Sequence, residues 1–266
     1  MGLNAMIRMT TALCAATLAT LPVAGQAMEA RDTFVTEYTF SLLGLPLGQS
    51  HFRSSVDGNR FTVEGSVRSS GLALVFDKTV AHSRVEGRLT DNGVVPDRYA
   101  MNYVSGEKKR ATALVFRDGN VIEARVSPKP RKNEKLVPVT AEHLKAVSDP
   151  MTASIVRAAS PEAVCGRTLH VFDGRMRMDI ALSNPQTGDV TIGSYKGPSV
   201  TCKAKFIPVA GYRTDRKSIQ YLRANDDISV TFARRGSTDV YAPVKASVPT
   251  YIGRLTIAAT RFGPAD

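Results

Sequence analysis

The residues that could carry acid–base chemistry are few and lie far apart in the sequence. Histidine most often exchanges protons near neutral pH, and the histidines fall in separate segments at His51, His82, His143 and His170. The sequence has no Gly-x-Ser-x-Gly elbow, no His-Glu-x-x-His pair, no glycine-rich phosphate loop and no Cys-x-x-Cys motif. These observations predict a protein that is not an enzyme and needs no metal or cofactor. A hydrolase whose histidines are assembled by folding is the less favoured alternative.

Two aspartates stand in contexts that bear on function. Asp149 directly precedes Pro150, the arrangement of an N-cap before a proline at the first helical position. Asp173, Gly174 and Arg175 follow one another and have two interpretations. In a turn, Asp173 would accept backbone N–H groups, Gly174 would supply an unusual backbone angle, and Arg175 would pair with an acid. In the less favoured interpretation, Arg175 contacts a ligand.

The N-terminal segment is typical of a targeting signal. Arg8 is followed by an uncharged stretch over residues 9–23, and small residues lead up to Ala27. This pattern predicts a secretory signal peptide over residues 1–27, cleaved near Ala27. Residues 28–266 are then expected as a single β-rich domain in the periplasm. A buried N-terminal helix is the disfavoured alternative.

The cysteines indicate a disulfide. Cys14 lies in the predicted signal and is preceded by Leu13, whereas a lipid-modified cysteine follows a small residue. Cys165 and Cys202 remain, and an even pair in an exported chain predicts a disulfide because the compartment is oxidising. A metal site is the rival, but neither cysteine has a second Cys or His at ligand spacing.

Alternation of apolar and polar side chains dominates the predicted domain. Apolar residues recur at every second position, the period of an antiparallel strand with one buried face. The clearest segments are residues 34–42, 60–67, 122–126, 176–182, 200–206 and 228–232. The aromatic residues expected to line a ligand site on the apolar face are Phe34, Tyr38, Phe40, Phe61 and Phe232. The alternative is that they pack against a helix near Met151 and Ile155.

Turn signals separate these segments, at Asp57-Gly58-Asn59, Asp91-Asn92-Gly93, Asp118-Gly119-Asn120 and Thr187-Gly188-Asp189. Closely spaced strands joined by tight turns predict a mainly β fold, a long antiparallel meander that curls into a barrel, half-barrel or spiral. A sandwich is the alternative. A short helical insert is expected at about residues 140–160, with a helix over 151–159. It would plug the concave side of the sheet or mark a boundary between two β halves.

The chain is basic, with a formal net charge of +11. Removing the predicted signal removes Arg8 alone, so the exported domain is also strongly basic. The excess favours contact with anionic lipid, lipopolysaccharide or peptidoglycan, with general solvation as the alternative, and the compartment argues against nucleic acid. After the signal no apolar run is long enough to span a membrane. The candidate basic groups are residues 108–110, 131–132, 203 and 205, 213 and 216–217, and 234–235.

Several motifs together resemble a known family. They are Tyr38-x-Phe-x-Leu-x-Gly44-Leu-Pro-Leu-Gly48, Val137-Pro-Val-Thr-x-Glu-His before Asp149-Pro150, Cys165 to Phe172-Asp173-Gly174-Arg175, and Cys202 to Pro208-Val-Ala-Gly211-Tyr212-Arg213. In order and spacing the chain is similar to the bacterial periplasmic proteins grouped as domain of unknown function 3108. The likeness spans roughly residues 34–262, and Met178 stands where an aromatic is expected. It implies export, a β-rich fold and a disulfide between the two cysteines, and it implies no activity.

The expected function is therefore a non-catalytic one in the cell envelope. Periplasmic β-spiral proteins of related architecture are associated with an intact envelope, and half-barrel lipoprotein carriers share the general shape, although a fold does not fix a function. The leading hypothesis is a protein that binds a lipid-like or peptide ligand in a curled sheet and so contributes to envelope integrity. The alternative is a structural protein whose basic face contacts an envelope polymer or protein. The sequence leaves the oligomeric state open.

Overall fold

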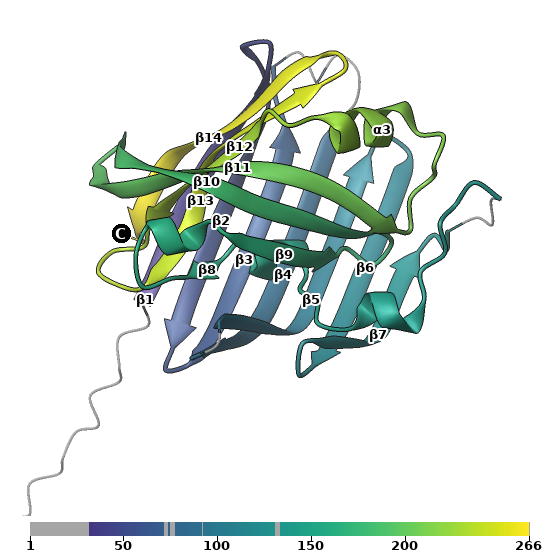
Figure 1. Cartoon of the computed structure of the whole chain (residues 1–266), viewed down its shortest axis with the longest axis horizontal. Coiled ribbons are helices and arrows are strands. Elements are labelled where there is room, and N and C mark those ends of the chain that lie inside the picture. Colours follow the sequence, from purple (N-terminus) through teal and green to yellow (C-terminus); the bar gives the residue numbers. More distant parts are fainter. Residues whose placement is uncertain (1–31, 72–73, 75–77, 92, 131–133, 266) are drawn as a thin grey trace, which may run out of the picture. The chain divides into compact units, whose positions relative to one another are not determined.

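The computed structural model describes residues 32–71, 74, 78–91, 93–130 and 134–265. The predicted signal peptide, residues 1–27, lies outside these. Residues Arg31–Asp266 form one compact unit, shown in Figure 1.

Two meanders make up the fold. The first consists of β1 (Asp32–Leu42), β2 (Leu45–Asp57), β3 (Arg60–Ser69), β4 (Thr79–Thr90), β5 (Gly93–Ser105), β6 (Lys108–Arg117) and β7 (Asn120–Ser127). The second consists of β9 (Arg167–Phe172), β10 (Arg177–Ile192), β11 (Tyr195–Ala210), β12 (Ile228–Arg234), β13 (Val240–Thr250) and β14 (Gly253–Pro264). Between them lie η1 (Ala141–Leu144), α2 (Pro150–Ala153), β8 (Val156–Arg157) and η2 (Glu162–Val164), and α3 (Lys217–Ala224) joins β11 to β12.

The meanders join through their first and last strands. β1 pairs with both β2 and β14, so one sheet runs from β7 through β1 and β14 to β9, with β8 attached to β13. The pairings are antiparallel, and Figure 1 shows β9, β10 and β11 crossing in front of β3 to β6. The prediction of a mainly β, curled antiparallel meander is confirmed. No ladder joins β7 to β9 among the described strands, so the sheet curls without closing.

The alternating pattern explains which face of each strand is buried. In β3, Phe61 and Val63 are buried, whereas Glu64, which follows Val63, is exposed. One of the predicted turns, at residues 187–189, is wrong. Residues 187–189 lie within β10, paired with β11, and the chain reverses beyond them, where Gly193 adopts φ +56°. Both strands simply continue as a long hairpin past the predicted turn.

The insert contains less helix than predicted. Asp149 is the N-cap of α2 as expected, but the helix ends at Ala153 instead of near residue 159. Val156 and Arg157 are extended because they pair with β13 as β8, and this tertiary pairing overrides the short helical pattern. In sequence the insert separates the two meanders, and its residues also lie on the concave side, so both predicted roles apply in part.

The insert fills the gap between the two open edges. Ser148 pairs with Val171 of β9 in a parallel bridge, and the Val147 N–H donates to the Gly119 carbonyl of the β6–β7 turn at 2.8 Å. We call this region, residues 147–149 and 172–175, the seam. Here backbone hydrogen bonds from the insert replace the missing ladder.

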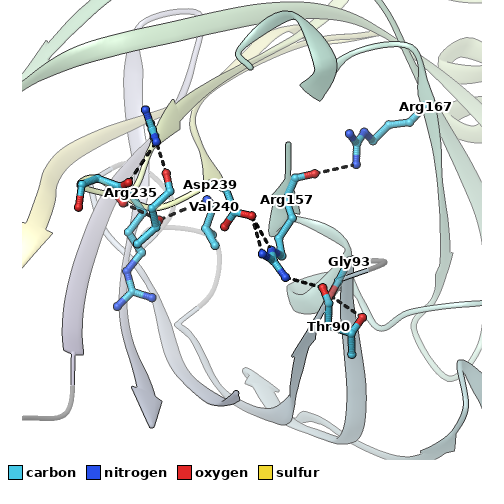
Figure 2. Close-up of polar contacts among 10 residues, drawn as sticks. Thr90, Gly93, Arg157, Arg167, Arg235, Asp239 and Val240 are labelled. Atoms are coloured by element: carbon cyan, nitrogen blue, oxygen red, sulfur yellow. Dashed lines mark hydrogen bonds and ion pairs between the residues drawn. The ribbon is translucent and has the colours of Figure 1, made fainter. Parts of the chain in front are cut away.

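Arg157 ties the insert to both meanders (Figure 2). Its Nε and Nη2 donate to Asp239 Oδ2 at 2.9 and 2.6 Å, and its Nη1 donates to the Thr90 carbonyl at the end of β4. Arg167 donates to the Arg157 carbonyl at 3.3 Å. A single guanidinium thus joins β8, the β12–β13 turn and the β4–β5 turn.

The predicted disulfide is present between Cys165 and Cys202, with the two Cα atoms 5.7 Å apart. Cys202 is fully buried on the apolar face of β11, between Val200 and Ala204. The bridge fixes the start of β9 to the centre of β11 within an apolar cluster that also contains Leu182.

Asp149 is a buried carboxylate. It is 0% exposed, and its Oδ1 accepts the N–H groups of Met151 and Thr152 at 2.8 and 3.0 Å. Oδ2 has no hydrogen-bond partner among the described residues. Burial raises the pKa of the carboxyl against the lowering effect of these hydrogen bonds, because transfer from water disfavours the charged form.

We predict that removing the disulfide lowers the melting temperature. A closed loop of 37 residues corresponds to roughly 4 kcal/mol in the chain-entropy model, or roughly 10 °C for a domain of this size. The double variant Cys165→Ala, Cys202→Ala is compared with the parent by thermal circular dichroism. Reductant should lower the melting temperature of the parent and leave the double variant unchanged, and a parent insensitive to reductant would contradict the prediction.

A second prediction concerns Asp149. The raised pKa means that the folded state binds the proton more tightly than the unfolded state. This proton stabilises the fold at pH below the unfolded value of about 3.9 and is lost as pH rises through the raised folded value. Asp149→Asn keeps the cap without titrating, so its stability relative to the parent should increase with pH across that window.

Asp149→Ala is the matched comparison, because it removes the cap and should cost about 1–2 kcal/mol. Urea unfolding between pH 4 and 8 measures both variants. A constant difference between the parent and Asp149→Asn at all pH values would show that the carboxyl does not titrate as argued.

Candidate functional site

The candidate site is an apolar cavity on the concave side of the sheet. It has a volume of about 380 Å³, within the range of small-molecule sites. Strands β1, β2, β3, β4, β13 and β14 form the walls, and α2 with the residues after it covers one side. The lining residues are Phe34, Thr36, Tyr38, Phe40, Ser50, Phe52, Ser54, Val56, Phe61, Val63, Leu89, Pro150, Met151, Ser154, Ile155, Arg235, Val240, Ala242, Pro243, Lys245, Ala246 and Ile257.

Four of the five aromatic residues expected to line a ligand site do line this cavity, namely Phe34, Tyr38, Phe40 and Phe61. The period of two places the β1 residues there, since every second side chain points to the concave face. Phe232 does not line it. Its side chain is 2% exposed and packs in the apolar cluster around the disulfide.

Tyr38 presents an apolar ring to the cavity. Its hydroxyl donates to the Pro243 carbonyl at 2.5 Å, so the one polar atom of the side chain is satisfied within the wall. Phe52 meets the ring edge-on, with the centroids 5.8 Å apart. Burial raises the pKa of Tyr38, so the phenol stays neutral at physiological pH.

The insert supplies the remaining wall. Met151 and Ile155 line the cavity and also pack against the apolar cluster that contains Phe61. The alternative that the aromatic residues pack against this segment therefore holds in part. The cavity nevertheless remains open between the insert and the aromatic residues of the strands. The Asp149 cap fixes the first turn of α2 and so sets the position of Met151.

Arg235 is the buried cation among the described lining residues of the cavity. It follows β12 and is 9% exposed. Its Nη2 donates to the Asp32 carbonyl at 3.0 Å and lies 3.1 Å from Asp32 Oδ2, and its Cζ lies 5.1 Å from the centroid of Phe34. Its Nε is buried without a partner among the described residues. Burial lowers the pKa of the guanidinium, against the opposing effect of Asp32.

Figure 2 shows the side chain of Arg235 directed away from the Arg157–Asp239 pair. The sequence gives no signal for this placement, because Arg235 lies beyond the end of β12 and its charge favours a surface position. A second buried polar atom, Ser50 Oγ, also lacks a partner among the described residues and belongs to the cavity wall.

The Asp173-Gly174-Arg175 segment forms the predicted turn. Asp173 Oδ1 accepts the N–H groups of Arg175 and Met176 at 2.8 and 2.7 Å. Gly174 adopts φ +94°, and a Cβ there would lie 2.5 Å from Thr112 Cγ2. Arg175 donates to the Pro128 carbonyl instead of pairing with an acid. The turn thus packs the second meander against β6 and β7 at the seam, and a ligand contact of Arg175 stays a prediction.

Three of the four histidines have separate partners. His51 Nδ1 lies 3.3 Å from Glu37 Oε1, and His170 Nδ1 lies 2.7 Å from Asp179 Oδ1. His143 Nδ1 accepts the Thr140 N–H at 3.1 Å.

The sheet register does place Ser66 between His51 and His82 on the outer face, which the sequence spacing did not indicate. These three residues line a groove there. Within the described part of the chain no hydrogen bond links Ser66 to either ring, and no cluster of three or more His, Cys, Asp and Glu side chains could hold a metal.

Several of the predicted basic groups, among the described residues, are paired with acids or buried. Lys205 and Arg213 form ion pairs with Asp226 and Asp215, and Arg235 is buried. Residues 108–110 are exposed at the β5–β6 turn, while residues 131–132 lie outside the described part.

A second apolar groove lies beside α3, a helix that the sequence reading missed. Its lining includes Leu42, Leu47, Leu222 and Leu255. Leu42 continues the cavity-facing series of β1, so this groove lies beyond Phe40 along the same strand.

Comparison with known proteins identifies the family. No curated protein has a sequence that matches the chain. A crystal structure of a beta-barrel-like protein of domain of unknown function DUF1849 from Brucella abortus is similar at 10% sequence identity and a TM-score of 0.47, covering 89% of this chain and 98% of that one. Among the described residues, no helix is both long and apolar enough to cross a bilayer. Residues 35–260 match the model of the protein family of unknown function DUF3108, and the chain therefore belongs to that family.

Proposed function

We propose that this protein is a non-catalytic binding protein of the bacterial cell envelope, which holds a lipid-like ligand in the cavity beneath Phe34, Tyr38 and Phe61. Export to the periplasm rests on the signal-like segment over residues 1–27. A contribution to envelope integrity would follow from sequestering or carrying such a ligand.

The apolar lining of the cavity carries this proposal. Aromatic and aliphatic side chains from the strands face Met151 and Ile155 of the insert across open space. An apolar chain bound there would remove its own surface and that of the cavity wall from water. Each Å² of apolar surface buried would contribute roughly 25 cal/mol of favourable free energy. The wall offers few hydrogen-bonding groups, which favours a lipid over a peptide, because a buried peptide needs partners for its backbone groups.

The alternatives have less support. A protein that binds an envelope polymer through a basic face would need unpaired cations over one surface, whereas Lys205 and Arg213 are paired with acids. A hydrolase would need a nucleophile hydrogen-bonded to its base, and the outer groove at Ser66 has no such bond among the described residues.

We predict that the purified exported domain carries lipid and that filling the cavity removes it. Ala246 lines the cavity, and Ala246→Trp would occupy the space of the ligand. Organic extraction followed by mass spectrometry should yield lipid from the parent and at least about tenfold less from the variant, equivalent to about 1.4 kcal/mol of binding free energy.

Ala113→Trp is the matched control, because Ala113 is exposed on the outer side of β6 and its replacement should leave the extract unchanged. A parent extract free of lipid, combined with no thermal shift on adding envelope lipids, would overturn the proposal.

We also predict an envelope phenotype. A deletion strain should be more sensitive to detergent and to envelope-acting antibiotics, and the parent gene should restore resistance whereas the Ala246→Trp gene should not. Cell fractionation should recover the processed protein in the periplasm. Full rescue by Ala246→Trp would separate the phenotype from the cavity, and cytoplasmic recovery would refute the proposed location.

A further inference from the structure

We infer that the cavity selects a single-chain amphiphile with an anionic head group, and that Arg235 binds the head group. This inference rests on the proposed function and names the chemical class of its ligand. The charged side chains of the described cavity wall are all positive. Arg235 and Lys245 line the cavity, and no Asp or Glu is found among the described lining residues.

The two cations differ in their surroundings. Lys245 is exposed, so its ammonium reaches water while its stem covers apolar wall. Arg235 is 9% exposed, and a buried charge is costly unless it is paired and hydrogen-bonded. Its one acid partner, Asp32, has a side chain that is 57% exposed, so this ion pair is screened by solvent on the side of Asp32.

The hydrogen bonds of Arg235 are incomplete. Nη2 is occupied by the Asp32 carbonyl, but the buried Nε has no partner among the described residues. Guanidinium donors form a planar fork that matches a carboxylate or a phosphate. Because protein atoms enclose the Nε, an anionic oxygen in the cavity would accept from the Nε–H after a small rotation of the side chain. That oxygen would offset the burial that lowers the pKa of Arg235.

The position of Arg235 gives the ligand a direction. The guanidinium stacks beside Phe34 near the start of β1, and the aromatic lining continues along that strand to Phe40. Six residues of strand span about 20 Å. A volume of about 380 Å³ suits one extended chain better than a lipid with several. The head group would lie at Arg235 and the tail would follow β1 towards Phe40.

The test compares ligands that share a tail and differ in the head group. Isothermal titration calorimetry of the exported domain uses laurate, dodecyl phosphate and dodecanol, with acetate and inorganic phosphate as head groups alone. We expect laurate or dodecyl phosphate to bind at least about tenfold more tightly than dodecanol, and the better of the two identifies the head group. Acetate and phosphate alone should not bind measurably.

Variants then assign the selectivity to Arg235. Arg235→Gln should weaken binding of the anionic ligand about tenfold and change dodecanol binding less than about twofold, while Arg235→Lys should retain part of the selectivity. Arg110→Gln is the matched control, because Arg110 is exposed on β6. Asp32→Asn removes the competing acid and should strengthen anion binding, which a purely structural ion pair would not do.

Each outcome bears on a distinct claim. Equal losses for laurate and dodecanol in Arg235→Gln would assign Arg235 a structural role and overturn the inference, as would equal affinity of the parent for both. In either case dodecanol binding would leave the proposed function standing. Failure of every chain-bearing ligand to bind would overturn both. Melting temperatures identify any variant that fails to fold, and Arg235→Lys and Asp32→Asn then decide the question.

Discussion

Arg157 joins the two meanders of a sheet in which, among the described strands, no ladder connects β7 to β9. An antiparallel sheet of this length must curl or split. Here it curls, and its two edge strands do not pair with each other in the described part of the chain. Unpaired edges usually invite association with other chains. The insert contacts both edges near Ser148. Arg157 fastens it to Asp239 in the second meander and to the Thr90 carbonyl in the first. This guanidinium and the backbone hydrogen bonds near Ser148 thus hold the insert against the concave side of the sheet.

The cavity exists because the sheet is wide and its concave residues are of mixed size. Small barrels fill their interior with side chains, whereas this sheet carries Ala246 and Ser50 beside the large rings. The two main apolar clusters lie on either side, one around the disulfide and one around Phe61 and the insert. The cluster around the disulfide draws mainly on the second meander, and the cluster around Phe61 draws mainly on the first, with Phe172 of β9 added. The strands that join the meanders, β1 and β14, line the space between the cores.

The sequence predicted the features that local pattern determines, such as which side chains share one face of a strand. The alternation placed Phe34, Tyr38 and Phe40 on one face of β1, and cysteine arithmetic paired Cys165 with Cys202. Phe232 followed the same alternation but joined the disulfide cluster, because a strand pattern specifies a face and not which core that face meets. The helix predicted to residue 159 yielded to pairing of Val156 with Tyr241. Both errors arise from contacts between residues far apart in the chain.

The burial of Arg235 in an apolar wall indicates a function more strongly than a charge on the surface would. Removing a guanidinium from water is costly, and pairing recovers the cost only when the geometry satisfies its donors. The ion pair with Asp32 and the contact with the Phe34 ring offset part of this free-energy cost. The buried Nε lacks a partner among the described residues. A side chain needed only to anchor β1 could remain at the surface beside Asp32. Its burial against the cavity aromatics favours a role inside the cavity, where an anion would complete its hydrogen bonds.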